Sequence, residues 1–219
     1  MALTFPLSQA TLGDILPVQI VNWSLRTFQE LSTAGDGEFQ AKDLAPPLWM
    51  GGVTLRPLLH TQARGMMAKL RALDGSINSF YLANPLGWYP AADPGGLIYG
   101  ASTPQIATIN ANRKELTISG LPANYELTEG DFFTVAYAGG LRTAMFQIVN
   151  SVTASGAGLT PSVEVRPHIS TGIVTTLPVN FAKPAAKVKI VPGTLDDSMH
   201  NANRTRISFQ VRQTLQAGN

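Results

Sequence analysis

Cysteine is absent from the 219-residue sequence, and this absence excludes several kinds of site. Disulfide frameworks, thiolate zinc sites, iron–sulfur clusters and cysteine nucleophiles all require that residue. Charge is also scarce, because Asp, Glu, Lys and Arg make up 14% of the chain against about 25% in an average protein. The hydrophobic content of 44% is too high for a disordered chain, so we expect a folded protein with a substantial core.

The scarcity of charge favours a surface that neighbouring subunits cover. Large protein interfaces are depleted in charge at their centres, although a monomer with a neutral polar surface is the alternative. The net charge of +2 is too small to indicate nucleic acid as the main partner. The charge is uneven, because residues 186–219 hold five basic side chains against Asp196 and Asp197. This segment predicts either a solvated strand face or a contact with a polyanion or an acidic subunit.

No segment of the sequence suits a membrane span or an export signal. The longest uncharged run, 143–163, is interrupted by Asn150, Gly156 and Pro161. The N-terminal segment lacks a basic start and contains Pro6, unlike a secretory signal. We therefore expect a soluble protein, made without an export signal and not inserted into a membrane.

Alternation of apolar and polar residues dominates the sequence and predicts a mostly β protein. Ile207, Phe209 and Val211 alternate with polar residues, which is the pattern of a half-buried antiparallel strand. A hairpin is predicted over 132–149, because the Ala-Gly-Gly sequence at 138–140 supplies the positive φ angles of a tight turn. Shorter strand patterns lie at 18–23, 116–118, 163–165 and 188–190.

One amphipathic helix is predicted over 61–74. Its apolar stripe has the spacing of a helix face, with Thr61 as the expected N-cap and Gly75 as the expected left-handed C-cap. The stripe is expected to close one face of an N-terminal sheet, with its two methionines packed in the core. The stripe consists of Ala63, Met66, Met67, Leu70 and Leu73.

A segment rich in proline and glycine at 84–96 predicts a loop or a domain junction. Strand patterns then follow at short intervals up to Pro184, as in a small barrel or sandwich. Since insertions succeed at exposed loop tips, we predict that 98–185 is a domain inserted into a host domain formed by 1–97 and 186–219.

Little in the sequence points to catalysis. His60, His168 and His200 lack the spacing of a helical metal site. The segment 196–200, Asp-Asp-Ser-Met-His, faintly suggests a metal or acid/base site, although a polar turn between strands is the stronger interpretation. No phosphate-binding loop, dinucleotide fingerprint, nucleophile elbow or zinc-protease helix occurs, so we expect no enzyme, no metal and no cofactor.

The aromatic residues of the junction allow three roles. Trp88 and Tyr89 can dock a sugar, dock a neighbouring subunit, or fill the gap between two domains. Trp23 and Trp49 fall in strand patterns and are expected in the core or at its edge.

Four segments in this order resemble the distal tail proteins of phages with long, flexible, non-contractile tails (siphophage-type tails) and of gene-transfer particles. The first two are the end of the predicted helix, 70–75 (LRALDG), and the turn 80–87 (FYLANPLG). The other two are 127–133 (LTEGDFF), which is similar to the start of that family's inserted barrel, and 155–167, which is similar to its end. Asn84 stands where that family commonly has aspartate.

The resemblance implies a tail-tube-like β-sandwich with one packed helix, carrying an inserted barrel similar to an oligonucleotide/oligosaccharide-binding (OB) fold. It also implies a structural virion protein that forms a ring, expected to be hexameric, at the tail tip or baseplate. Tail tube and hub proteins, and also a tape measure or receptor-binding protein, are the implied partners. DNA passes through the lumen, and assembly takes place in the bacterial cytoplasm.

Several residues are interface candidates on this interpretation. The helix cations Arg64, Lys69 and Arg71 can meet the next subunit, as can Trp88 and Tyr89, while Arg206 and Arg212 can face the lumen or an acidic tape-like protein. Two other functions stay open: a carbohydrate-binding module that uses the insert with Trp88 and Tyr89, and a polysaccharide-cleaving enzyme that uses Asp196, Asp197 or His200.

Overall fold

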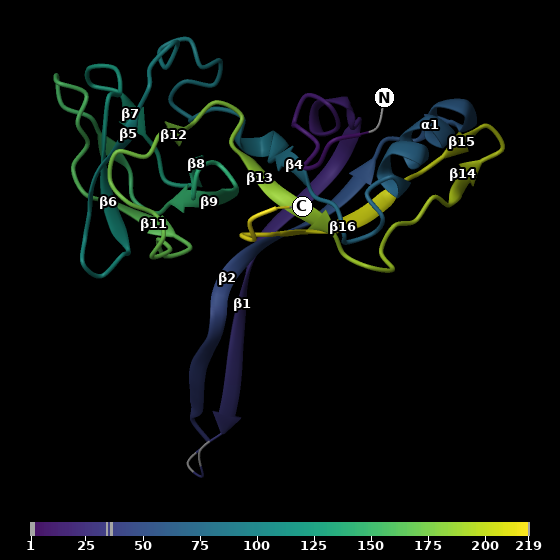
Figure 1. Cartoon of the computed structure of the whole chain (residues 1–219), viewed down its shortest axis with the longest axis horizontal. Helices are drawn as coiled ribbons and strands as arrows, with labels where there is room; N and C mark the ends of the chain where they lie inside the picture. The colour runs from purple at the N-terminus through teal and green to yellow at the C-terminus, as the bar shows by residue number, and fades with distance from the viewer. Residues whose placement is uncertain (1–2, 34, 36, 219) are drawn as a thin grey trace.

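A computed structural model describes residues 3–33, 35 and 37–218, and in them the fold is mostly β with one α-helix. A barrel-like group of strands lies at one side, a sheet with the helix at the other, and a long hairpin projects away from both (Figure 1). The predicted mostly β fold with one packed helix is thereby confirmed. Among the described residues, none of the helical segments is long and apolar enough to cross a lipid bilayer.

A five-stranded antiparallel sheet joins the two ends of the chain. The predicted alternation near the C-terminus is confirmed, because Phe209 and Val211 are buried while Gln210 and Arg212 are exposed. The strand itself begins at Ser208, so Ile207 of the predicted alternation precedes it. In spatial order the strands are β1 (Val18–Thr33), β2 (Phe39–Leu55), β16 (Ser208–Gln213), β13 (Ala185–Ile190) and β4 (Phe80–Ala83).

Helix α1 (His60–Arg71) packs against one face of this sheet, as predicted. Ala63, Met67 and Leu70 are buried in the same hydrophobic cluster as the sheet residues, and Met66 packs at its margin. The predicted core role of both methionines is confirmed. Short connecting elements complete this part of the chain: the 3-10 turns η1 (Gly13–Ile15) and η2 (Pro85–Gly87), and the small sheet β14 (Met199–Asn201), β15 (Arg204–Thr205) and β3 (Leu58–Leu59).

The predicted helix ends need correction. Leu59, not Thr61, occupies the N-cap position, and no side chain caps the helix there. The reason is that β3 pairs with β15 and leads directly into the helix, where the Nδ1 atom of His60 lies 2.7 Å from the Thr205 hydroxyl. At the other end the helix stops at Arg71, and Ala72 in right-handed conformation, not Gly75, occupies the C-cap position. Gly75 has the predicted left-handed conformation, with φ of 68°, but it lies beyond the cap.

Six further strands form a nearly closed, barrel-like sheet. Its first and last strands approach each other, because an isolated bridge joins Gln105 to Pro178 and the Ile106 amide donates to the Leu177 carbonyl. A two-stranded ladder, β7 (Glu126–Leu127) with β10 (Val152–Thr153), lies beside it. In spatial order the six are β12 (Val179–Asn180), β8 (Phe132–Tyr137), β9 (Arg142–Ile148), β11 (Val163–Arg166), β6 (Glu115–Ser119) and β5 (Gln105–Ile109).

The hairpin predicted over 132–149 is confirmed as β8 and β9. Ala138, Gly139 and Gly140 all have positive φ at its turn, as expected from the sequence.

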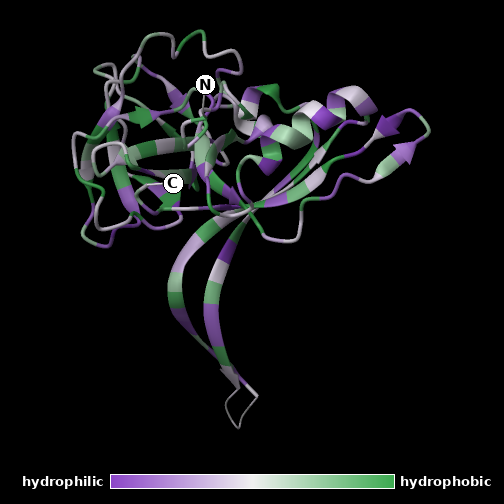
Figure 2. Ribbon diagram, turned by 45° about the vertical axis from the view of Figure 1, so that its right-hand side comes forward, coloured by the Kyte–Doolittle hydropathy of each residue, from purple (hydrophilic) through white to green (hydrophobic). Residues whose placement is uncertain are grey.

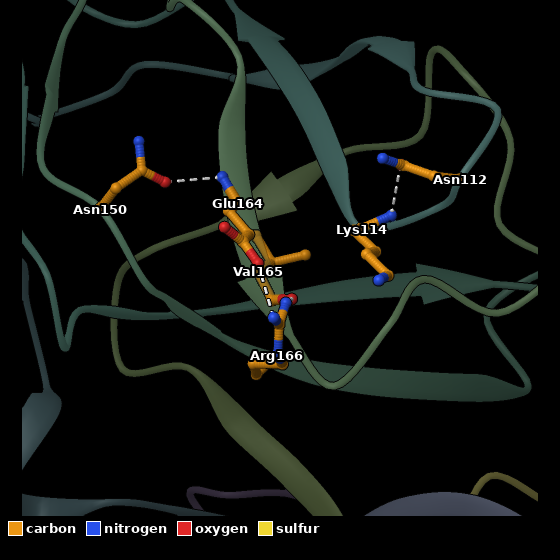
Figure 3. Close-up of polar contacts among 6 residues, drawn as sticks. All are labelled: Asn112, Lys114, Asn150, Glu164, Val165 and Arg166. Atoms are coloured by element: carbon orange, nitrogen blue, oxygen red, sulfur yellow. Dashed lines mark hydrogen bonds and ion pairs between the residues drawn. The ribbon is translucent and has the colours of Figure 1, made fainter.

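Strand β11 contains the predicted strand pattern 163–165, and its hydrogen bonds hold it in the barrel-like sheet. The Glu164 amide donates to the Asn150 side chain at 2.8 Å, and the Arg166 guanidinium contacts both the Val165 carbonyl and the Glu164 carboxylate (Figure 3). Beside it, the Lys114 amide donates to the Asn112 side chain and the Lys114 carbonyl accepts from the Val165 amide. The amides of Glu164 and Val165 therefore hold the strand to its neighbours, while the contacts of Arg166 stay within the strand.

Two hydrophobic clusters divide the described residues. One combines α1 with the five-stranded sheet, and the other fills the barrel-like sheet between Tyr99 and Phe181. Met145 and Phe132 from the barrel strands pack into the first cluster, so the two clusters are in contact. Whether 98–185 folds as an independent insert stays a prediction.

Candidate self-association surfaces

The most prominent exposed feature is the end of the β1–β2 hairpin. Strand β16 pairs with β2 only from Met50 to Thr54, so beyond Met50 the two strands continue as a ribbon that projects from the molecule (Figure 1). We call residues 29–43 the arm, and residues 26–28 with 44–48 the arm base. A two-stranded ribbon is at best marginally stable in water by itself, so an arm of this kind gains stability from a partner that covers it.

The local sequence explains why the hairpin bends away at the arm base. The register shifts between Arg26 and Phe28 and again between Phe28 and Gln29, each time because β2 carries an extra residue. Bulges of this kind bend a strand and increase its twist. Pro46 and Pro47 lie at the same place and donate no ladder hydrogen bonds, which suits a segment that leaves a sheet.

The two faces of the arm differ in chemistry. On one face Leu31 lies opposite Ala41 and Thr33 lies opposite Phe39, and the side chains of Leu31 and Phe39 are 64% and 76% exposed. The opposite face is polar and presents Ser32 with Gln40 and Glu30 with Lys42. Figure 2 shows this alternation of hydropathy along the hairpin. Large apolar side chains exposed on a projecting ribbon mark an interaction surface.

A groove of about 780 Å³ lies beside the arm base, on the C-terminal strands. Apolar groups form much of its wall, and cationic side chains lie among them. The apolar lining includes Phe28, Pro46, Leu48, Ile190, Pro192 and Leu215, and the cations are Arg142, Lys189 and Arg212.

The cations of the groove lack acidic partners. Lys189 and Arg212 are directly opposite each other in the β13–β16 ladder, and like charges in that position repel. Within the residues that the structure describes, no carboxylate lines the groove or forms an ion pair with Lys189, Arg212 or Arg142. The groove therefore presents three uncompensated positive charges to solvent.

A fourth cation, Lys187, lies buried in the same region and is only 1% exposed. Its ammonium donates to the main-chain carbonyls of Leu141, Gln216 and Gly218. Burial, and then the charge of Lys189, lower the pKa of this lysine. Lys187 thus ties the C-terminal segment to the β8–β9 turn and forms part of the support of the groove.

The junction after β4 forms a second exposed surface. Leu86 and Leu97 are almost fully exposed there, and Ile98 is largely exposed. Trp88 is half-exposed, but the Lys183 ammonium lies 4.8 Å from its ring centroid and the Lys183 amide donates to its carbonyl. These contacts fasten Trp88 between the junction and the start of β13.

Asp93 organises the junction from within, although no pattern in the sequence distinguishes it. Its carboxylate is buried and accepts hydrogen bonds from the Leu97 amide at 2.9 Å and the Tyr99 amide at 2.8 Å. Burial opposes its ionisation, but the amides of Tyr99, Ile98 and Leu97 with the Tyr125 hydroxyl outweigh it, so the pKa of Asp93 is lowered. Burial and the Asp93 charge raise the pKa of Tyr125 in turn.

Asp93→Asn is expected to lower the free energy of unfolding at pH 7 by about 2 kcal/mol, because an amide cannot accept on both of its polar atoms. A depressed folded-state pKa contributes stability above the unfolded value of about 3.9 that is lost as the pH falls through the folded-state pKa. Urea denaturation should therefore show the two proteins converging in acid. Asp197→Asn, which removes only an exposed ion pair with Arg71, is the control. An unchanged difference at low pH would contradict this account.

Two of the segments that carry the resemblance meet in space. The Asn84 side chain accepts from the Leu86 amide and caps η2, and a Cβ on Gly87 would lie 2.9 Å from the Phe132 ring. The carboxylate of Asp131 accepts from the Ala91 amide at 2.8 Å, which joins 127–133 to the junction. These turn residues therefore hold the junction against the barrel strands.

The remaining predicted interface residues come from different elements and are exposed, except for Tyr89. Arg64 and Lys69 are exposed on α1, while Arg71 forms an exposed ion pair with Asp197 at 3.0 Å. Tyr89 is half-buried and close to Gly96. Arg206 lies before β16 and does not line the groove, whereas Arg212 does.

The weak metal or acid/base candidate finds no support in the geometry. In the described part of the chain, no three His, Asp or Glu side chains come together as metal ligands. The segment 196–200 leads into the exposed strand β14. Comparisons with protein-family models and with curated proteins found no match for this chain.

Proposed function

We propose that this protein is a structural subunit of a phage tail tip, one that assembles head to tail into a ring around the DNA channel. The projecting arm is the single observation that carries the proposal. It adds a large apolar and polar surface to the molecule but almost nothing to either hydrophobic core. A ribbon of this kind gains stability when another subunit covers it.

Two further observations support self-assembly. The arm and the groove are different surfaces of one chain, and contact between two different surfaces generates rings when the rotation closes. The low charge content of 14% suits a subunit with large interfaces on both sides. The proposed stoichiometry of six comes from the resemblance to distal tail proteins.

The proposal assigns roles to the two parts of the fold. The five-stranded sheet with α1 corresponds to the ring-forming, tail-tube-like domain of 1–97 and 186–219. The barrel-like sheet corresponds to the inserted OB-like domain of 98–185, which would lie at the periphery and offer an attachment surface. Tail tube, hub and tape measure proteins would be the neighbours in the virion.

Replacing residues 29–44 by Asn-Gly tests the proposal. Phe28 and Ala45 are cross-strand partners, so a two-residue turn can join them without disturbing the sheet. We expect the shortened protein to keep the thermal stability of the full chain and to lose self-association. Light scattering over a concentration series, with negative-stain microscopy of the concentrated samples, measures the second property.

Closed rings of the full chain, absent from the shortened variant, are the expected result. Glu126→Lys, a charge reversal at an exposed position of β7, is the control with an intact arm. A full chain that stays monomeric at every concentration would overturn the ring, whereas rings that form equally well without the arm would overturn the role of the arm in assembly.

A further inference from the structure

We propose that the arm of one copy docks in the groove of a second copy, with Leu31 and Phe39 against the apolar wall and the acidic residues of the arm against Arg142, Lys189 and Arg212. This inference rests on the proposed function in that both require self-association. It goes further by naming the two surfaces and the chemistry that matches them.

The apolar groups of the two surfaces are complementary. Leu31 and Phe39 lie diagonally on one face of the arm and have no cover in their own chain. The groove offers a wall that includes Ile190, Pro192 and Leu215 in a volume of about 780 Å³, which is large enough for two such side chains. Docking would remove both apolar surfaces from water.

The charges of the two surfaces are also complementary. The sequence of the arm, 29–43, carries four acidic residues and a single lysine, while the groove carries three cations and, among the described residues, no carboxylate. The repulsion between Lys189 and Arg212 across their ladder position is relieved when an acidic segment lies over them. An anionic and apolar ribbon is therefore the occupant that the groove fits.

The occupant has to come from another copy. Phe28 and Pro46 of the arm base form part of the groove, and the arm continues away from the body (Figure 1). A chain cannot bring the tip of this ribbon back to its own base without breaking the β1–β2 ladder. The contact joins two different surfaces of the chain, and repeating it head to tail produces a ring or an open chain.

Cross-linking between single-cysteine variants tests the contact, because the natural chain has no cysteine to interfere. An equimolar mixture of Phe39→Cys and Gln216→Cys, treated with a short bis-maleimide, is expected to give a mixed dimer, whereas each variant alone is not. Gln40→Cys places the thiol on the opposite face of the arm and is the matched control. Its yield with Gln216→Cys should be several times lower.

Charge reversal provides a second readout. Arg212→Glu is expected to weaken self-association at least about tenfold, because a like charge then meets the acidic arm. Adding Asp43→Lys to the same chain should restore much of the loss, because Asp43 lies on the face of the arm that carries Leu31 and Phe39. Both positions are exposed, so circular dichroism and thermal unfolding should match those of the natural chain.

The outcomes separate this inference from the proposed function. Rings without the mixed cross-link, or with Phe39→Cys cross-linked to itself, would overturn docking in the groove and leave the ring intact. If the groove binds a different acidic protein, the mixed cross-link would also be absent, and docking of the arm in the groove would be overturned. Mixed cross-links in open chains would support docking and overturn the ring, and a monomer without cross-links would overturn both.

Discussion

Gly158→Ala is expected to lower the free energy of unfolding of the barrel by about 2–4 kcal/mol. Gly158 has φ of 72°, a conformation that costs energy for any residue with a Cβ. A Cβ there would also lie 2.1 Å from the carbonyl oxygen of Leu121. This oxygen belongs to the main chain, so it cannot move aside as the end of a flexible side chain could. The Leu121 amide donates to the Gly158 carbonyl, so both chain segments would have to move together.

Gly156→Ala is the matched control two residues away. Nothing lies within 4 Å of the position of its Cβ, and its φ is not in the left-handed region. We expect a change within about 0.5 kcal/mol at this exposed position. Urea denaturation followed by far-UV circular dichroism compares the two variants. Equal stability of both would show that the 121–158 contact relaxes without cost.

The sequence could predict the elements that depend on local patterns. The alternation at 207–211, the turn at 138–140 and the stripe of α1 each lie within a few residues of one another, and all three are confirmed. Thr61 was wrong as a helix cap because β3 and β15 are distant in sequence, and their pairing fixes where the helix begins. The residues around Thr61 therefore cannot predict where the helix begins, because the pairing of β3 with a strand distant in sequence determines that position.

The arm shows a different limit. Within β1 only 18–23 was predicted as strand, whereas the strand extends to Thr33 and pairs with β2 over nearly its whole length. The two bulges break the period of two, and Pro46 with Pro47 interrupts the strand pattern of β2. Beyond the arm base the two strands pack against no core of their own chain, so neither face has to be buried. The alternation of apolar and polar residues that predicts a strand is therefore weaker there. The Gly35 to Gly37 segment was the available signal of a hairpin turn.

The groove could not be predicted, because its parts come from distant segments. Lys189 and Arg212 meet only through the β13–β16 ladder, and Arg142 comes from the start of β9. The sequence did predict an excess of positive charge after residue 186 and an acidic contact as one explanation. The structure adds that two of these cations share one ladder position beside an apolar wall.

Trp49→Ala is expected to lower the stability of the cluster around α1 by about 3–5 kcal/mol. The side chain of Trp49 is only 4% exposed, and its ring meets that of Phe132 edge to face with centroids 5.4 Å apart. Its indole Nε1 donates to the Met145 carbonyl at 2.9 Å. Truncation thus removes a large buried ring and leaves that carbonyl of β9 without its partner.

Trp49→Phe separates the two contributions. It keeps most of the apolar packing and loses only the indole donor, so a smaller loss of about 1–2 kcal/mol is expected. Because Trp49 lies where the barrel strands contact the five-stranded sheet, both variants also test the predicted division of the chain. Hydrogen exchange read by mass spectrometry reports the stability of each part.

The two parts should respond unequally to Trp49→Ala if 98–185 is an independent insert. Peptides from β2, β13 and β16 would lose protection by the full amount, whereas peptides from β6 and β11, which lie inside the second cluster, would keep most of theirs. An equal loss in all five strands would mean that the chain unfolds as one cooperative unit. The contact of Trp49 with Phe132 and Met145 would then be part of a shared core, and the insert would not fold by itself.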